Sequence, residues 1–167
     1  MDRLYTPWRL PYIVNPKPSN CPFCDYLHQD PARDPDNLLL LRGRHAFVVL
    51  NRFPYNNGHL MVLPNQHVAY LTDLDDATQA EIMKLTTYCT DLLGRAFRAH
   101  GFNVGINLGK AAGAGMEPHL HVHIVPRWEG DTNFMPVIAK TRVLPEWLAD
   151  TYERLRQAME EHPYRPS

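Results

Sequence analysis

The sequence lacks long apolar runs and an excess of charge of either sign. Its 167 residues include 17 Lys and Arg against 18 Asp and Glu, which gives a formal net charge of -1. It has no run of about 18 apolar residues, the length that a membrane-spanning helix needs, and no apolar stretch at the N-terminus of the kind that a signal peptide carries. A nearly neutral chain also has no broad basic field to attract duplex nucleic acid. These absences predict a cytoplasmic protein with neither a membrane nor duplex nucleic acid as a partner.

Cysteine is scarce as well, and its spacing argues against a framework of disulfides. Of the three cysteines, Cys21 and Cys24 form a Cys-Pro-Phe-Cys motif, and Cys89 lies in a helical pattern and is expected in the core. In a chain without an export signal, such a motif is more typical of metal or redox chemistry. The proline-rich segment before the motif is not a strand, which disfavours a thioredoxin-like use. A zinc knuckle fits better, although one such motif supplies only two of the four ligands.

Hydrophobic periodicity predicts strands on both sides of one long helix. Apolar residues recur every three or four positions from Asp73 to His100, with acidic residues near the start and Gly101 beyond the end, so this segment is predicted to be the long helix. A second helix is expected after Pro145. Residues 1–36 are rich in proline and aromatic residues and are expected to form an ordered arm without regular structure. Short apolar runs predict strands at residues 38–41, 46–50, 59–64, 102–108 and 120–125.

These elements predict one α+β domain. Its antiparallel sheet of about five strands would carry one long central helix and a C-terminal helix. The length of the chain, with 44% hydrophobic and 21% charged residues, fits a single domain that buries its own core.

Three histidines at alternate positions are the most informative feature of the chain. His119, His121 and His123 are interleaved with aliphatic residues. Period two indicates a strand, so the imidazoles would line one face at a spacing of about 6.6–7 Å while the aliphatic side chains enter the core. A solvated, histidine-rich face is the usual explanation for one histidine, but not for three in register. A metal site and nucleophilic catalysis by one imidazole remain open at this point.

The loop before the histidines suits the binding of phosphate. Residues 109–115 are mostly glycine and alanine, which lets backbone N–H groups approach an anion beside an imidazole. A loop of this composition is most often just a turn. Its position next to three histidines favours a phosphate-binding role.

At this point the chain resembles the histidine triad (HIT) superfamily of nucleotidyl hydrolases and transferases. Residues His119 to Val125 match the family signature His-φ-His-φ-His-φ-φ, and Asn51 to His59 match its upstream Asn-x-x-Pro-x-x-x-Gly-His segment. Three further segments are similar to those of bacterial diadenosine tetraphosphate phosphorylases: Thr-Pro-Trp-Arg at residues 6–9, Cys-Pro-Phe-Cys at 21–24 and Gly-Asp-Thr-Asn-Phe at 130–134. The resemblance implies a HIT catalytic core at residues 37–130. The N-terminal arm with its zinc knuckle (1–36) would belong to the same domain, and a C-terminal extension with a helix (131–167) would follow.

The resemblance also implies roles for individual residues. His121 would be the nucleophile that attacks the α-phosphorus and carries a nucleotidyl-histidine intermediate, while His123 and His59 would donate hydrogen bonds to phosphate oxygens or to the leaving group. Asn51 would hold the ribose, and Asn107 would contact the same region. The remaining candidate substrate-binding residues are Lys110, Gly113, Ala114, Gly115, Met116 and Arg127.

One departure from the family pattern concerns the loop before the triad. Many HIT hydrolases carry Gly-Gln-Ser or Gly-Gln-Thr there, whereas this chain has Gly113-Ala-Gly-Met-Glu-Pro118 and lacks the glutamine. We expect the backbone amides of Ala114, Gly115 and Met116 to replace that contact. The altered loop could leave room for inorganic phosphate as the second nucleophile in place of water, with Lys110 or Arg127 beside it.

The two missing metal ligands have candidates through the same resemblance. In zinc-carrying relatives, the motif is completed by a histidine after the next strand and by the first histidine of the triad, which here are His67 and His119. Together with Cys21 and Cys24 they would form a closed, structural zinc site. The alternative for His67 is an exposed turn histidine. No organic cofactor is expected, and the other histidines, His28, His45, His100 and His162, are expected on the surface.

Three functions follow from these observations. The leading hypothesis is an enzyme that cleaves dinucleoside polyphosphates, such as diadenosine tetraphosphate, through a nucleotide on His121, with phosphate or water as second nucleophile. One alternative is hydrolysis of adenosine phosphoramidates or aminoacyl-adenylates. Another is a zinc-dependent nucleotide-binding module without catalysis. Because family members usually pair sheets edge to edge, a homodimer is expected.

Overall fold

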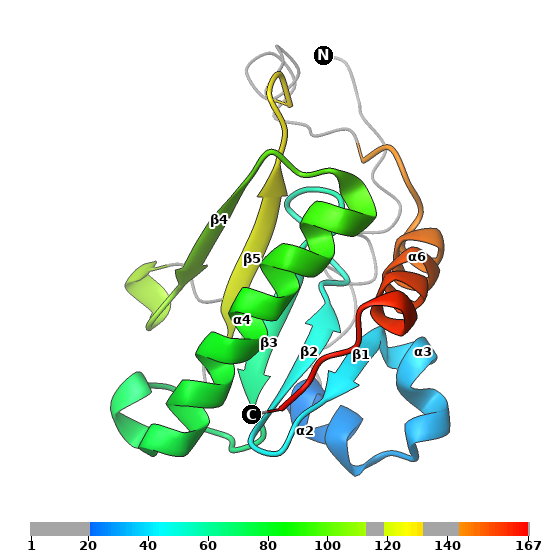
Figure 1. The fold of residues 1–167 in the computed structure, drawn as a ribbon. Helices are drawn as coiled ribbons and strands as arrows, with labels where there is room; N and C mark the ends of the chain where they lie inside the picture. The colour runs from blue at the N-terminus through cyan, green and yellow to red at the C-terminus, as the bar shows by residue number, and fades with distance from the viewer. Residues whose placement is uncertain (1–20, 113–118, 132–143, 167) are drawn as a thin grey trace, which may run out of the picture.

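The computed structural model describes residues 21–112, 119–131 and 144–166. Five antiparallel strands form one sheet in the order β1-β2-β3-β5-β4, and helices cover both of its faces (Figure 1). The predicted α+β fold is therefore confirmed. The strands are β1 (Leu39–Arg42), β2 (Ala46–Leu50), β3 (Leu60–Pro64), β4 (Gly101–Ile106) and β5 (Val122–Arg127). The helices are α2 (Pro22–His28), α3 (Asp34–Asn37), α4 (Asp76–Phe97) and α6 (Leu148–Glu161).

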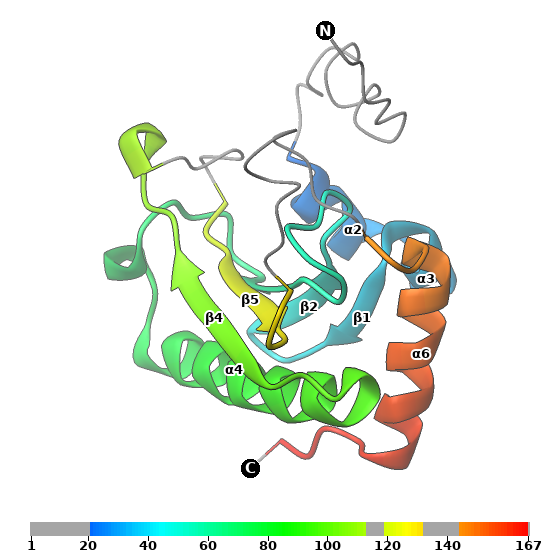
Figure 2. The ribbon, with the colours of Figure 1, turned by 90° about the horizontal axis from the view of Figure 1, so that it is seen from above.

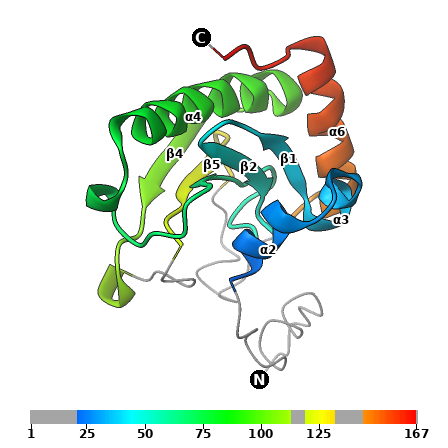
Figure 3. The same cartoon turned by 90° about the horizontal axis from the view of Figure 1, so that it is seen from below.

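The sheet separates two apolar layers. Helix α4 crosses one face and α6 packs beside it, whereas α2 lies on the opposite face (Figures 2 and 3). Side chains alternate between the layers with period two: in β2, Val48 faces α4 and Phe47 faces α2. On β3, Val62 and Met61 are divided in the same way. The α4 side holds the larger of the two clusters.

Helix α4 is shorter than the predicted segment at both ends. Asp75 is its N-cap, because its carboxylate accepts the N–H of Thr78 at 2.8 Å, and residues Leu71–Asp73 form a separate 3-10 turn. The helix ends at Phe97, and Arg98 is its C-cap with a left-handed φ of 51°. Cys89 is fully buried in the core, as expected. None of the helices in the described ranges has both the length and the apolar character that crossing a bilayer requires.

The expectation that the N-terminal arm lacks regular structure is wrong for the part that is described. Residues 22–28 form α2, a 3-10 turn follows at Pro31–Arg33, and α3 comes directly after it. Each element has a proline in its first turn, where the missing N–H costs no intrahelical hydrogen bond. The prolines therefore start helices here and do not exclude them. Cys21 is the N-cap of α2, so the cysteine motif opens a helix.

Arg42 of β1 fixes α2 to the edge of the sheet. Its guanidinium donates to the carbonyl of Leu27 at 3.0 Å and to that of Tyr26 at 2.9 Å, and it pairs with Asp34 at 2.6 Å. These carbonyls lie at the C-terminal end of α2, where a cation is favourable.

A buried carboxylate fixes the turn between β1 and β2. Glu81 of α4 accepts the backbone N–H groups of Arg44, His45 and Ala46. Strands β1 and β2 pair antiparallel, so this turn closes a hairpin and is connected to the long helix.

Candidate active site and metal centre

The histidine row lies on the face of the sheet opposite α4. Strand β5 begins at Val122, so His119 and His121 precede it and only His123 lies within it. The side chains still alternate, because Val122 and Ile124 enter the cluster under α4. The three histidines are 1%, 7% and 8% exposed, so they do not form a solvated face.

A fourth histidine joins the row from the start of β3. Met61 of β3 pairs with His123, and His59 lies just before the strand with its Nε2 atom 3.0 Å from Nδ1 of His123. The turn that delivers His59 needs Gly58, whose φ is +72° and whose missing Cβ would lie 3.1 Å from the side chain of Leu93. This turn places His59 and His123 in direct contact.

The hydrogen-bond network assigns tautomers to these imidazoles. Nδ1 of His59 accepts the backbone N–H of Tyr55 at 3.0 Å and lies 3.2 Å from the amide nitrogen of Asn51. Its Nε2 atom therefore carries the proton and donates it to Nδ1 of His123, which leaves the proton of His123 on Nε2. Nε2 of His123 is buried and has no hydrogen-bond partner among the described residues. The site thus contains a buried N–H donor that none of the described residues accepts.

His121 has the opposite arrangement. Its Nδ1–H donates to the carbonyl of His119 at 2.8 Å, so the lone pair is on Nε2. The rings of His121 and His123 lie 4.7 Å apart, centroid to centroid. The ring with a free Nε2 lone pair therefore packs against the ring with the buried Nε2–H.

Two aromatic side chains that we did not predict border the histidines. Phe23 of α2 lies 6.1 Å from the ring of His121, and Tyr55 lies 4.6 Å from His59 and 5.5 Å from His123. The only signals for them in the sequence are their positions, one between the two cysteines and the other four residues before His59.

Burial keeps the imidazoles of His59 and His123 neutral. Loss of hydration lowers the pKa of His59 to about 3 and that of His123 to about 4, with neighbouring histidines adding to both shifts. Both side chains are therefore uncharged at neutral pH, in agreement with the tautomers above.

We expect the buried histidines to make the protein less stable in weak acid. Between pH 6.5 and about 4, His59 and His123 are protonated in the unfolded chain but not in the folded protein. The free energy of unfolding therefore decreases as the pH is lowered, by up to about 1.4 kcal/mol per pH unit for each histidine. Urea unfolding between pH 7 and pH 4.5, with a chelator in every sample, measures this slope. The variant His59→Asn should have a shallower slope, and an unchanged slope would contradict the assignment.

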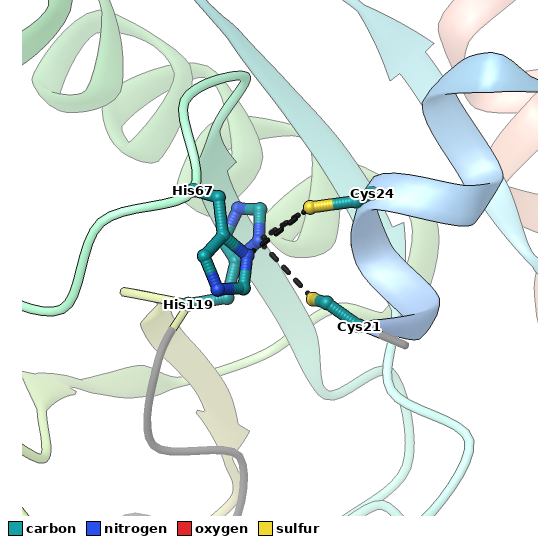
Figure 4. A group of neighbouring side chains, drawn as sticks. All are labelled: Cys21, Cys24, His67 and His119. Atoms are coloured by element: carbon teal, nitrogen blue, oxygen red, sulfur yellow. Dashed lines mark hydrogen bonds between the residues drawn. The ribbon is translucent and has the colours of Figure 1, made fainter. Parts of the chain in front are cut away.

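Two cysteines and two histidines from distant parts of the chain form a second cluster (Figure 4). Cys21 and Cys24 come from the start of α2, His67 follows β3, and His119 begins the histidine row. Sγ of Cys24 lies 3.1 Å from Nδ1 of His67, and Sγ of Cys21 lies 3.4 Å from Nδ1 of His119. The four ligand atoms all lie within 4.8 Å of one another.

This geometry fits a tetrahedral metal ion. Metal–sulfur bonds of about 2.3 Å and metal–nitrogen bonds of about 2.0 Å place sulfur and nitrogen ligands about 3.5 Å apart. The side chain of His119 is also oriented for ligation, because its Nε2–H donates to the carbonyl of Pro64 at 2.8 Å and leaves the lone pair of Nδ1 toward the sulfurs. The predicted set of four residues could therefore hold a metal ion.

The other predicted site residues lie in different surroundings. The amide of Asn51 is buried, with its oxygen accepting the N–H of Phe53, and Asn107 follows β4 and is half-buried. Arg127 lies four residues beyond His123 in β5, and its guanidinium pairs with Asp131 at 2.6 Å. Lys110 begins a 3-10 turn at Lys110–Ala112, whereas Gly113, Ala114, Gly115 and Met116 lie outside the described residues. Of the remaining histidines, His28, His100 and His162 are exposed and His45 is half-buried.

A five-stranded antiparallel sheet that presents a row of histidines beside a fourth one at the start of β3 defines a HIT-type domain. The model of the HIT domain family matches residues 33–130, which is more than half of the chain. The chain therefore belongs to the HIT domain family, and the resemblance found in its sequence is confirmed.

Within the family, the chain is similar to several known proteins. It is 41% identical to an AP-4-A phosphorylase from Mycobacterium tuberculosis over 157 residues, which cover 90% of this chain and 80% of that protein. It is 35% identical to an asymmetrical bis(5'-nucleosyl)-tetraphosphatase from Schizosaccharomyces pombe over 90 residues, 54% of this chain and 49% of the other. The crystal structure of a zinc-bound histidine triad family protein from Mycobacterium smegmatis has a TM-score of 0.62 at 28% identity and covers 85% of this chain and 94% of its own.

Proposed function

We propose that this protein cleaves dinucleoside polyphosphates, with diadenosine tetraphosphate as the representative substrate, through a nucleotide bound covalently to His121. The observation that carries the proposal is the pair of opposite tautomers, an Nε2 lone pair on His121 beside a buried Nε2–H on His123. The names of the M. tuberculosis and S. pombe relatives support this substrate class.

The reaction would proceed in two displacements at one phosphorus atom. Nε2 of His121 attacks the α-phosphorus, the P–O bond to the rest of the polyphosphate breaks, and the imidazole becomes a cation whose Nδ1–H is held by the carbonyl of His119. Nε2–H of His123 donates to a phosphate oxygen or to the leaving group, where negative charge develops. Phosphate or water then displaces His121 and releases the mononucleotide.

Other residues would bind the substrate. Asn51 would hold the ribose, and Asn107 would contact the same part of the nucleotide. For the phosphate chain we propose the backbone amides of residues 113–116, and for the second nucleophile Lys110. Arg127 has less support in this role, because its guanidinium is already paired with Asp131.

The Cys21, Cys24, His67 and His119 cluster would hold zinc in a structural role. Four protein ligands complete a tetrahedral shell, and the zinc-bound M. smegmatis relative supports the choice of metal. Bound zinc would supply a cross-link between α2, the loop after β3 and the histidine row.

We further propose that the protein forms a homodimer through the edge of its sheet. Strand β4 is an edge of the sheet, and residues 103–105 in its middle are exposed. An exposed edge strand can pair with the same strand of a second copy, and two-fold symmetry makes this contact self-complementary.

Product analysis tests the proposed function. The purified protein is incubated with diadenosine tetraphosphate, with and without inorganic phosphate, and the nucleotides are separated. We expect cleavage next to the α-phosphorus. ADP and ATP formed only with phosphate indicate a phosphorylase, and AMP and ATP formed without it indicate a hydrolase. No turnover of any dinucleoside polyphosphate would contradict the proposal, and faster turnover of adenosine phosphoramidate in competition would favour that alternative substrate.

A further inference from the structure

Phe23 lies between the two cysteines of the metal cluster and contacts the histidine row. Its side chain is 8% exposed, and its ring lies 5.7 Å from that of His119 and 6.1 Å from that of His121. It also belongs to the apolar cluster on this face of the sheet. One side chain therefore touches both a candidate metal ligand and the proposed nucleophile.

Among the described residues, a small number of contacts orient the His121 ring. Its hydrogen bond to the carbonyl of His119 fixes the position of Nδ1, but a single hydrogen bond leaves the ring plane free to tilt. The aromatic rings of Phe23 and His123 pack against it, at 6.1 and 4.7 Å. Loss of the Phe23 ring would leave a cavity beside the imidazole and allow this tilt.

The position of Phe23 depends in turn on α2. This helix has seven residues and no side-chain hydrogen bond at its N-cap, so it is too short to be stable in isolation. It is held against the sheet by the cysteine–histidine cluster at its first turn, by Phe23 itself and by Arg42 at its last turn. A metal bound by Cys21 and Cys24 would fix the residue between them most directly.

We propose that Phe23 is a positioning residue, through which the metal site holds the His121 imidazole in the orientation of attack. This inference rests on the proposed role of His121 as nucleophile. His119 would provide a second link, because its ring would bind the metal while its carbonyl accepts Nδ1–H of His121. Removing Phe23 breaks one link and leaves all four metal ligands in place.

The test compares Phe23→Ala and Phe23→Leu with Leu39→Ala, all loaded with zinc. Leu39 is buried in the same apolar cluster, but it lies in β1, three strands away from β5. We expect all three variants to bind one zinc per chain. In Phe23→Ala, kcat for diadenosine tetraphosphate should fall by about 10- to 100-fold with KM nearly unchanged, because a misplaced nucleophile slows the chemical step. Phe23→Leu should recover part of kcat, and Leu39→Ala should keep kcat even where its Tm is lower.

A second readout does not depend on activity. In protein with ¹⁵N-labelled histidines, the His121 ring signals should report one Nδ1–H tautomer in the parent chain and in Leu39→Ala. In Phe23→Ala we expect them to broaden or to report mixed tautomers.

Two results would overturn the inference. An unchanged kcat and unchanged ring signals in Phe23→Ala would show that Phe23 does not orient His121. A rise in KM alone would show that Phe23 contacts the substrate base. If the parent chain turns over no dinucleotide, the proposed function fails, whereas the ring signals still report whether Phe23 orients His121.

Discussion

Replacing His121 with alanine should reduce turnover of diadenosine tetraphosphate by about 10,000-fold or more, because in the proposed mechanism its imidazole forms the covalent bond to phosphorus. Substrate binding should change much less, since the phosphate and ribose contacts proposed above remain. Steady-state kinetics together with nucleotide binding to the variant measure the two effects separately.

The matched control is His100→Ala, which removes an exposed histidine that accepts the N–H of Glu129. It should retain parental activity. In addition, substrate labelled at the α-phosphorus should leave label on the parent protein after an alkaline quench, but none on His121→Ala. Retention of more than about one hundredth of parental activity in His121→Ala would contradict the covalent mechanism.

Removal of the proposed zinc ion should cause a large loss of stability. A ligand that binds only the folded protein at about 1,000 times its Kd contributes about 4 kcal/mol to the free energy of unfolding. For a chain of this size, that corresponds to a decrease in Tm of about 8–16 °C. Differential scanning calorimetry with and without a chelator measures it, and elemental analysis of the purified protein identifies the metal.

The matched pair for this prediction is His67→Ala and His28→Ala. His67 contributes a ligand atom to the cluster, whereas the ring of His28 donates to the carbonyl of Cys24 at 2.7 Å and lies outside the set. The first variant should lose metal and its response to the chelator, and the second should keep both. Equal metal content in the two variants would rule out the assigned ligand set.

The strands and the long helix could be predicted from the sequence because their patterns are local. Alternation around Val122 and the three- to four-residue period around Cys89 report which side of each element is buried. Helix α2 is hard to predict because proline usually interrupts regular structure, whereas Pro22 occupies a first-turn position.

The site could be predicted only in part. The candidate ligands Cys21 and His119 are 98 residues apart in the chain, and in the sequence only the family resemblance connects them. The tautomers depend on backbone groups such as the N–H of Tyr55 and the carbonyl of His119, which exist in every sequence and acquire direction only after folding. The packing of Phe23 on His121 is likewise a product of tertiary structure.

The strict alternation before and within β5 limits how this protein can vary. A single residue inserted between His119 and Ile124 would turn the segment beyond it inside out, sending imidazoles under α4 and aliphatic side chains to the opposite layer. Such a shift in register would remove the histidines from the site and the aliphatic side chains from the core. We therefore expect single-residue insertions to be far more damaging within this segment than in the loops on either side of it.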